Sequence, residues 1–153
     1  MRAYYLPLVA GAALAASAFM PRIRMGDVSL GGIPAMSAFW ILALGLAAMA
    51  LASLSVITRK NSRHPLLLVG LIAIGIEFVG WQWLERVTTE QAWATAQAEA
   101  IVAGSPAAEP APTTPAAGLY MSFAAAAAIA AFGLTIVVKQ GVTPYAAPQD
   151  DDV

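Results

Sequence analysis

The chain has 153 residues and a formal net charge of −1, and 59% of its residues are apolar against only 11% that are charged. Because an ordinary soluble domain has roughly 25% charged residues, this composition excludes a typical water-soluble globule and predicts a membrane protein. The absence of cysteine excludes disulfide scaffolds and thiolate metal sites, the single histidine excludes a bis-histidine haem, and the eight scattered basic residues form no patch for nucleic acid.

Four apolar stretches are long enough to cross a bilayer. A membrane-spanning helix needs about 20 mostly apolar residues, because the hydrocarbon core is about 30 Å thick and a helix rises about 1.5 Å per residue. The stretches are residues 3–20, 33–57, 65–84 and 116–138. We therefore predict an all-α integral membrane protein, in which four transmembrane helices form an up-down bundle within residues 1–139 and one short additional helix lies on the outer side.

The first stretch, residues 3–20, has two interpretations. Met1-Arg2, an apolar run and then Ala16-Ser17-Ala18 are typical of a signal peptide with a small-residue cleavage site. A single arginine makes a weak basic region, however, and Tyr4 and Tyr5 suit an aromatic anchor at the membrane interface. We favour a retained span and keep the signal peptide as the alternative.

The loop after this span, residues 21–32, contains three glycines and alternating apolar residues. This pattern predicts a short hairpin or turn that lies on the surface. Arg22 and Arg24 are in this loop, and we expect solvated charges there. Contact of the two arginines with lipid phosphate is the second interpretation.

Basic residues near the span ends predict the orientation, since short loops rich in Lys and Arg stay in the cytoplasm. With the N-terminus inside, the turn at 59–63, between the second and third spans, is the densest basic cluster. The cytoplasmic basic residues are then Arg2, Arg59, Lys60, Arg63 and Lys139, and the outer ones are Arg22, Arg24 and Arg86. We predict a multi-pass protein of the bacterial inner membrane with both termini in the cytoplasm.

Glu77 is the one charged side chain deep inside a predicted span. It lies 12 residues after Pro65, or about 18 Å along a helix, and an ionised carboxylate facing lipid at that depth would cost several kcal/mol. Gly70, Ala73 and Gly80 share its helical face, and small residues allow two helices to approach closely. We therefore expect Glu77 to point into a helix interface. Donors at comparable depth on the other spans are Ser17, Trp40 and Ser122.

Two residues of the third span have both a functional and a structural interpretation. Glu77 could relay protons or cations, but a relay needs several polar groups in series, so we favour a protonated carboxyl that joins helices or holds a lipid or quinone headgroup. His64 could ligate a chlorophyll magnesium or a haem iron. Its place between Arg63 and Pro65, at the cytoplasmic mouth of the span, favours an ordinary interfacial histidine.

Aromatic and polar residues mark the outer end of the third span. Trp81 and Trp83 are typical of an interfacial aromatic belt, with an aromatic binding site as the alternative. Trp93 lies farther along, on residues 88–102, which we predict to be a separate short helix that contacts the bilayer or a partner. Thr88 is available to cap its start, and Gly104 follows its end.

Two segments outside the spans are predicted to lack a fold of their own. Residues 105–115 contain four prolines among Ala, Thr and Glu, which is typical of an extended, polyproline-like tether. Residues 140–153 contain two prolines and three consecutive aspartates, with too little apolar content to pack. We therefore expect a flexible, acidic cytoplasmic tail.

The sequence contains no Walker loop, dinucleotide-binding glycine pattern, nucleophile elbow or metal-ligand spacing, so we do not expect an enzyme. We expect a non-catalytic accessory or scaffold subunit of a larger membrane complex, of respiratory or photosynthetic type, acting through helix packing. Its partners would be other integral membrane subunits and lipids. No intrinsic cofactor is expected, although the interfaces could hold a lipid, a quinone or a pigment. The alternatives are a small proton-coupled transporter that uses Glu77 and a membrane sensor that uses the outer segment.

The layout resembles a loose group of small four-span bacterial inner-membrane proteins of unassigned activity. The resemblance covers most of the chain and implies architecture only. It rests on short motifs, which are Phe19-Met20-Pro21, Gly26 with Gly31-Gly32, the basic turn from Arg59 to Arg63, and Gly118-Leu119-Tyr120 at the start of the last span.

Overall fold

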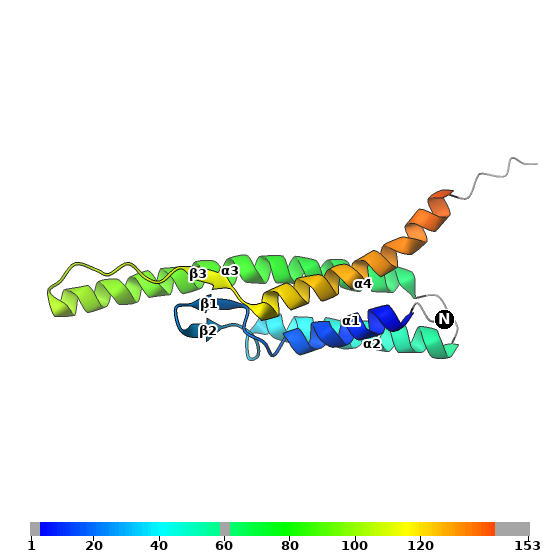
Figure 1. Ribbon diagram of the computed structural model, residues 1–153, viewed down its shortest axis with the longest axis horizontal. Coiled ribbons are helices and arrows are strands. Elements are labelled where there is room, and N and C mark those ends of the chain that lie inside the picture. The colour runs from blue at the N-terminus through cyan, green and yellow to red at the C-terminus, as the bar shows by residue number, and fades with distance from the viewer. Residues whose placement is uncertain (1–3, 59–61, 143–153) are drawn as a thin grey trace, which may run out of the picture.

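A computed structural model describes residues 4–58 and 62–142, and the side chains of these up to Thr135 (Figure 1). Four helices pack along one long axis, and one of them, α3, continues well beyond the others (Figure 1). A small sheet lies beside the projecting part of α3. The helices are α1 (Tyr5–Ser17), α2 (Met36–Thr58), α3 (Arg63–Ala103) and α4 (Ala117–Val142), and the strands are β1 (Ile23–Met25), β2 (Val28–Leu30) and β3 (Thr113–Pro115).

Three of the helices are long and apolar enough to cross a membrane, namely α2, α3 and α4. The fourth, α1, has only 13 residues and falls short of that length. It ends at Ser17 because the N–H groups of Ala18, Phe19 and Met20 bond to carbonyls three residues back, and Pro21 then disfavours a helical Met20. In the part of the chain that the structure describes, the helix at the predicted span 3–20 is therefore shorter than expected.

The long helix α3 corrects the prediction of two separate helices. The expected span at 65–84 and the expected outer helix at 88–102 form one helix of 41 residues, about 60 Å long. Thr88 does not cap a new helix, because its hydroxyl donates to Leu84 O at 2.7 Å, one turn back in the same helix. The predicted end is confirmed, since Gly104 adopts φ +64° and its N–H bonds to Ala100 O.

The prediction of an all-α fold needs one correction, because the structure also contains a small three-stranded sheet. β1 is the central strand and pairs antiparallel with both β2 and β3. The predicted hairpin is confirmed, with a two-residue turn in which Gly26 has φ +56°. The end of the proline-rich segment is not a free tether, because Thr113–Pro115 forms the third strand of this sheet.

Small residues bring the helices into close contact. A Cβ on Gly45 would lie 2.6 Å from Ala15 N on α1, and one on Gly70 would lie 2.6 Å from Ala130 N on α4. Gly133 meets Leu67 of α3 in the same way. The close helix contacts that small residues allow are therefore made largely within this bundle.

Two predictions concern the chain ends and the basic turn. The first residues of the predicted flexible tail, 140–142, are helical, because α4 continues to Val142. Residues 143–153 lie outside the described part of the chain, as do residues 1–3 and 59–61 of the basic turn.

Candidate functional site

The most unusual feature of the interior is a buried ion pair. Arg22, which lies between α1 and β1, donates from Nη1 to Oε2 of Glu77 on α3 at 2.6 Å. The arginine side chain is 2% exposed and the glutamate side chain 0% exposed. The expectation that Arg22 is a solvated or lipid-facing charge is therefore wrong, whereas Arg24 is exposed as expected.

Two segments hold the backbone of Arg22 in place. Its N–H donates to Leu30 O at 2.9 Å, and its carbonyl accepts from Ala116 N at 2.8 Å. The end of β2 and the start of α4 thus fix this residue from both sides. Gly31 leaves room for the side chain, since a Cβ there would lie 2.8 Å from Arg22 Cβ, and its φ of +92° suits glycine.

The ion pair explains how a carboxylate can lie inside this bundle. Desolvating two charges is costly, and their mutual attraction with a short hydrogen bond offsets the cost. Burial lowers the pKa of Arg22 from its ordinary value, and the carboxylate of Glu77 acts in the opposite direction. A guanidinium titrates so far above neutrality that it keeps its charge. We conclude that Arg22 is the partner of Glu77.

Of the three donors predicted for Glu77, two donate to backbone carbonyls and the third lies at the surface. Ser17 donates to Leu14 O at 2.6 Å. Ser122 lies beside the Glu77 carboxyl but donates to Leu119 O at 2.8 Å. Trp40 is 58% exposed. Within the described side chains, Glu77 Oε1 and the Nε and Nη2 of Arg22 have no hydrogen-bond partner, and such buried atoms usually bind an ordered water.

The prediction that Glu77 faces a helix interface is confirmed. Gly70 and Ala73 on the same face are buried, with Gly70 against Ala130 of α4. Gly80 lies close to Ser37 of α2, whose Cβ would be 3.3 Å from a Cβ on the glycine. The face therefore packs against other helices of the same chain.

The remaining predicted residues lie nearer the surface. His64 is exposed in the first turn of α3, and the described residues contain no group of three His, Cys, Asp or Glu side chains that could hold a metal ion. The rings of Trp81 and Phe78 make an edge-to-face contact at a centroid distance of 6.4 Å. Trp83 is 65% exposed and Trp93 is 41% exposed. The structure thus places none of them at the ion pair.

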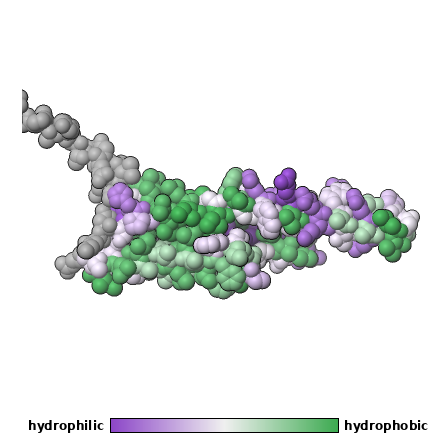
Figure 2. All heavy atoms as spheres, turned by 180° about the vertical axis from the view of Figure 1, so that it is seen from behind, coloured by the Kyte–Doolittle hydropathy of each residue, from purple (hydrophilic) through white to green (hydrophobic). Residues whose placement is uncertain are grey.

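An apolar groove of about 820 Å³ lies between α2 and α3 on the surface of the bundle. Trp40 and Met36 contribute from α2, and Ile72, Val79 and Trp83 from α3. Gly75 opens into it, because a Cβ there would meet nothing within 4 Å. We call this surface the α2–α3 groove. Figure 2 shows the wider context, with apolar surface over the bundle and polar residues along the projecting part of α3.

No protein family, no curated protein and no solved structure matches this chain. The interpretation of its function therefore rests on its own residues.

Proposed function

We propose that this chain crosses the bacterial inner membrane four times, with both termini in the cytoplasm, and serves as a non-catalytic accessory subunit of a larger membrane complex. Three long apolar helices support the membrane location. The short helix α1 packs on both α2 and α4, which supports its position at the same depth as a fourth span. The excess of basic residues on one side supports the orientation.

The α2–α3 groove is the observation that carries the proposal. Gly45, Gly70 and Gly133 each pack against a neighbouring helix of the same chain. The α2–α3 groove is open at Gly75, and its lining is almost entirely apolar. Trp40, Val79 and Trp83 are large apolar side chains exposed at it. Its occupant is a transmembrane helix of a partner, with large apolar side chains that pack against Gly75 and its neighbours.

A transporter that moves protons through Glu77 has less support. Its carboxylate is fully buried and bonded to Arg22, so each cycle would have to break a buried ion pair at a cost of several kcal/mol. A proton flux in proteoliposomes that Glu77→Gln abolishes would favour the transporter over the accessory subunit.

Site-specific photo-crosslinking in native membranes tests the proposal. A photoreactive residue at Val79, which lines the α2–α3 groove and is 65% exposed, should give a discrete adduct with one membrane protein. The matched control is Leu46 on α2, which is 53% exposed and does not line this groove, and it should give lipid adducts only. Lipid adducts alone at Val79 would contradict the proposal.

A groove-filling variant sharpens the test. Gly75→Trp places a ring in open space, so the fold should survive while the adduct from Val79 and the co-purification of the partner are lost. Leu71→Trp adds the same ring to the same helix, where the side chain is exposed outside the groove, and should leave the adduct intact. Equal adduct yields from the two variants would show that the groove is not the contact surface.

A further inference from the structure

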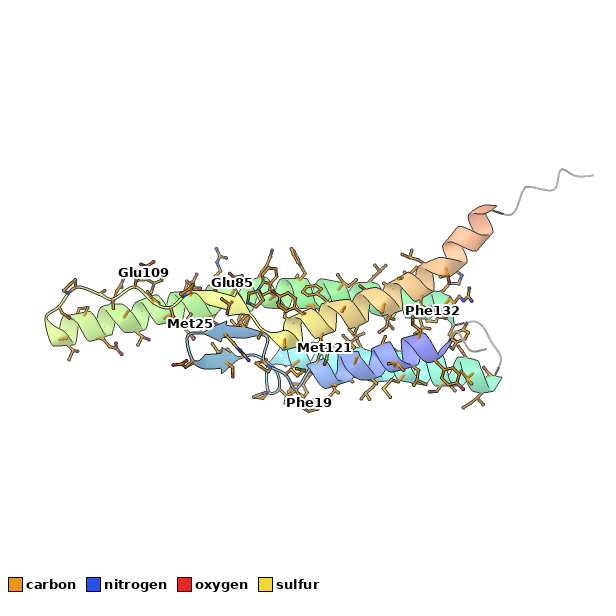
Figure 3. All side chains as sticks on the ribbon, in the orientation of Figure 1. Phe19, Met25, Glu85, Glu109, Met121 and Phe132 are labelled. Carbon is orange, nitrogen blue, oxygen red and sulfur yellow. The ribbon has the colours of Figure 1, made fainter. Side chains whose placement is uncertain are left out.

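A second groove lies outside the apolar bundle, between the projecting part of α3, strand β1 and the loop that runs back beside α3. It has a volume of about 790 Å³, and we call it the head groove. Figure 3 shows Met25 and Glu85 near the sheet and Glu109 farther along the returning loop. The residues that matter for its chemistry are Met25, Glu85, Thr89, Trp93, Glu109 and Thr113.

The residues that line the head groove come from one face of α3, one face of the sheet and the returning loop. Glu85, Thr89 and Trp93 follow each other at four-residue intervals, so they share one face of α3. Met25 and Thr113 are directly paired across β1 and β3, which places both on the same face of the sheet. Arg24 precedes Met25 in β1, and its side chain points to the opposite face because side chains alternate along a strand.

The groove carries two carboxylates that no arginine neutralises. Among the side chains that the structure describes, neither Glu85 nor Glu109 forms an ion pair, and Glu85 Oε1 accepts a long hydrogen bond of 3.5 Å from Thr113 Oγ1. Arg86 is the nearby base on α3, and it pairs with Glu90 through Nε at 3.6 Å.

The segments around the head groove also carry a net negative charge. Across residues 23–31 and 85–115 the sequence contains five acidic residues, Asp27, Glu85, Glu90, Glu99 and Glu109, against the two arginines Arg24 and Arg86. A concave surface of this kind concentrates cations from solution.

We propose that the head groove binds a water-soluble organic cation with an alkylated ammonium group. The half-exposed ring of Trp93 offers an aromatic face, Met25 offers a polarizable apolar contact, and Glu85 and Glu109 supply the opposite charge from two separate segments. The volume lies within the range of small-molecule sites and is far larger than a bare metal ion needs. This proposal is independent of any partner at the α2–α3 groove.

Choline and its neutral isostere 3,3-dimethylbutanol, which differ in charge but not in shape, test the cation directly. The full chain is placed in nanodiscs of phosphatidylglycerol, so that no choline lipid competes, and binding is followed by saturation-transfer NMR and Trp fluorescence. Choline should bind at least about tenfold more tightly than the isostere. Equal affinity for the two compounds, or no binding of choline, would overturn the proposal.

Substitutions then locate the site. Glu85→Gln and Trp93→Leu should each weaken choline binding by about tenfold, since each removes one interaction with the cation. Glu99→Gln is the matched control, because this exposed acid lies on α3 outside the head groove. If Glu99→Gln weakened binding as much as Glu85→Gln, the attraction would be diffuse and the groove would not be the site. Circular dichroism and thermal unfolding of each variant separate loss of binding from loss of fold.

Discussion

An arginine lies at each end of the bundle, and the two make different kinds of contact. At the sheet end, Arg22 is buried and bonded to the carboxylate of Glu77. At the other end, the guanidinium of Arg63 lies 5.4 Å above the ring of Phe132, which also meets the edge of Tyr4 at 5.1 Å. Tyr4 in turn accepts a hydrogen bond from Ser62 N at 3.3 Å. One end is therefore held by a desolvated charge pair and the other by aromatic contacts around the buried ring of Phe132.

This difference has an energetic consequence. Removing one partner of a buried ion pair leaves the other charge without compensation, which typically costs about 3–5 kcal/mol. A cation over an aromatic ring contributes about 0.5–1 kcal/mol when exposed and about 2 kcal/mol when desolvated, which is still below the loss expected for a broken ion pair. The sheet end should therefore be the more fragile end when a single side chain is changed.

The largest effect is expected for the ion pair itself. Arg22→Met should lower the free energy of unfolding by about 3–5 kcal/mol, because it leaves the Glu77 carboxylate buried and unpaired. Adding Glu77→Gln to this variant should restore much of the loss, since no charge then remains. Unfolding by SDS in detergent micelles measures all the variants. A double variant as unstable as the sum of the two single ones would show that the residues do not act as a pair.

A smaller effect is expected for the glycine that accommodates Arg22. Gly31→Ala should lower the free energy of unfolding by about 2–4 kcal/mol, because it combines an unfavourable positive φ with a clash against Arg22 Cβ. Gly104→Ala is the matched control, since Gly104 also has a positive φ but open space around it, and it should cost only about 1–2 kcal/mol. Equal losses in the two variants would mean that the contact with Arg22 contributes nothing.

The smallest effect is expected at the aromatic end. Phe132→Leu keeps an apolar side chain against the core but loses the ring contacts with Tyr4 and Arg63, so it should cost about 1–2 kcal/mol. A double-mutant cycle with Tyr4→Leu should give a coupling energy of about 0.5–1.5 kcal/mol. A loss in Phe132→Leu as large as that in Arg22→Met would remove the contrast between the two ends.

The orientation of Glu77 could be predicted from sequence, but its partner could not. The spacing of Gly70, Ala73 and Glu77 gives the buried face directly, because small residues on a helix allow a close neighbour. Arg22 lies 55 positions away in a short loop, where arginines are usually solvated. Its burial depends on backbone bonds to Leu30 and Ala116, which only the folded sheet provides.

Helix ends show the same limit. Gly104 ends α3 as predicted, because a left-handed glycine is a local signal. The proposed cap at Thr88 was wrong, because a threonine hydroxyl can equally bond back to the preceding turn, as it does to Leu84 O. The third strand at Thr113–Pro115 is set by pairing with β1, about 90 residues earlier in the chain, which no short pattern records.

The unbroken course of α3 has a mechanical consequence. With neither glycine nor proline between positions 81 and 103, the part of α3 that carries Glu85 and Trp93 is one uninterrupted length of helix. A bound molecule that displaces this projecting part therefore moves both side chains together. Bending of the helix is expected nearer the bundle, at Gly75 and Gly80, where α3 borders the α2–α3 groove.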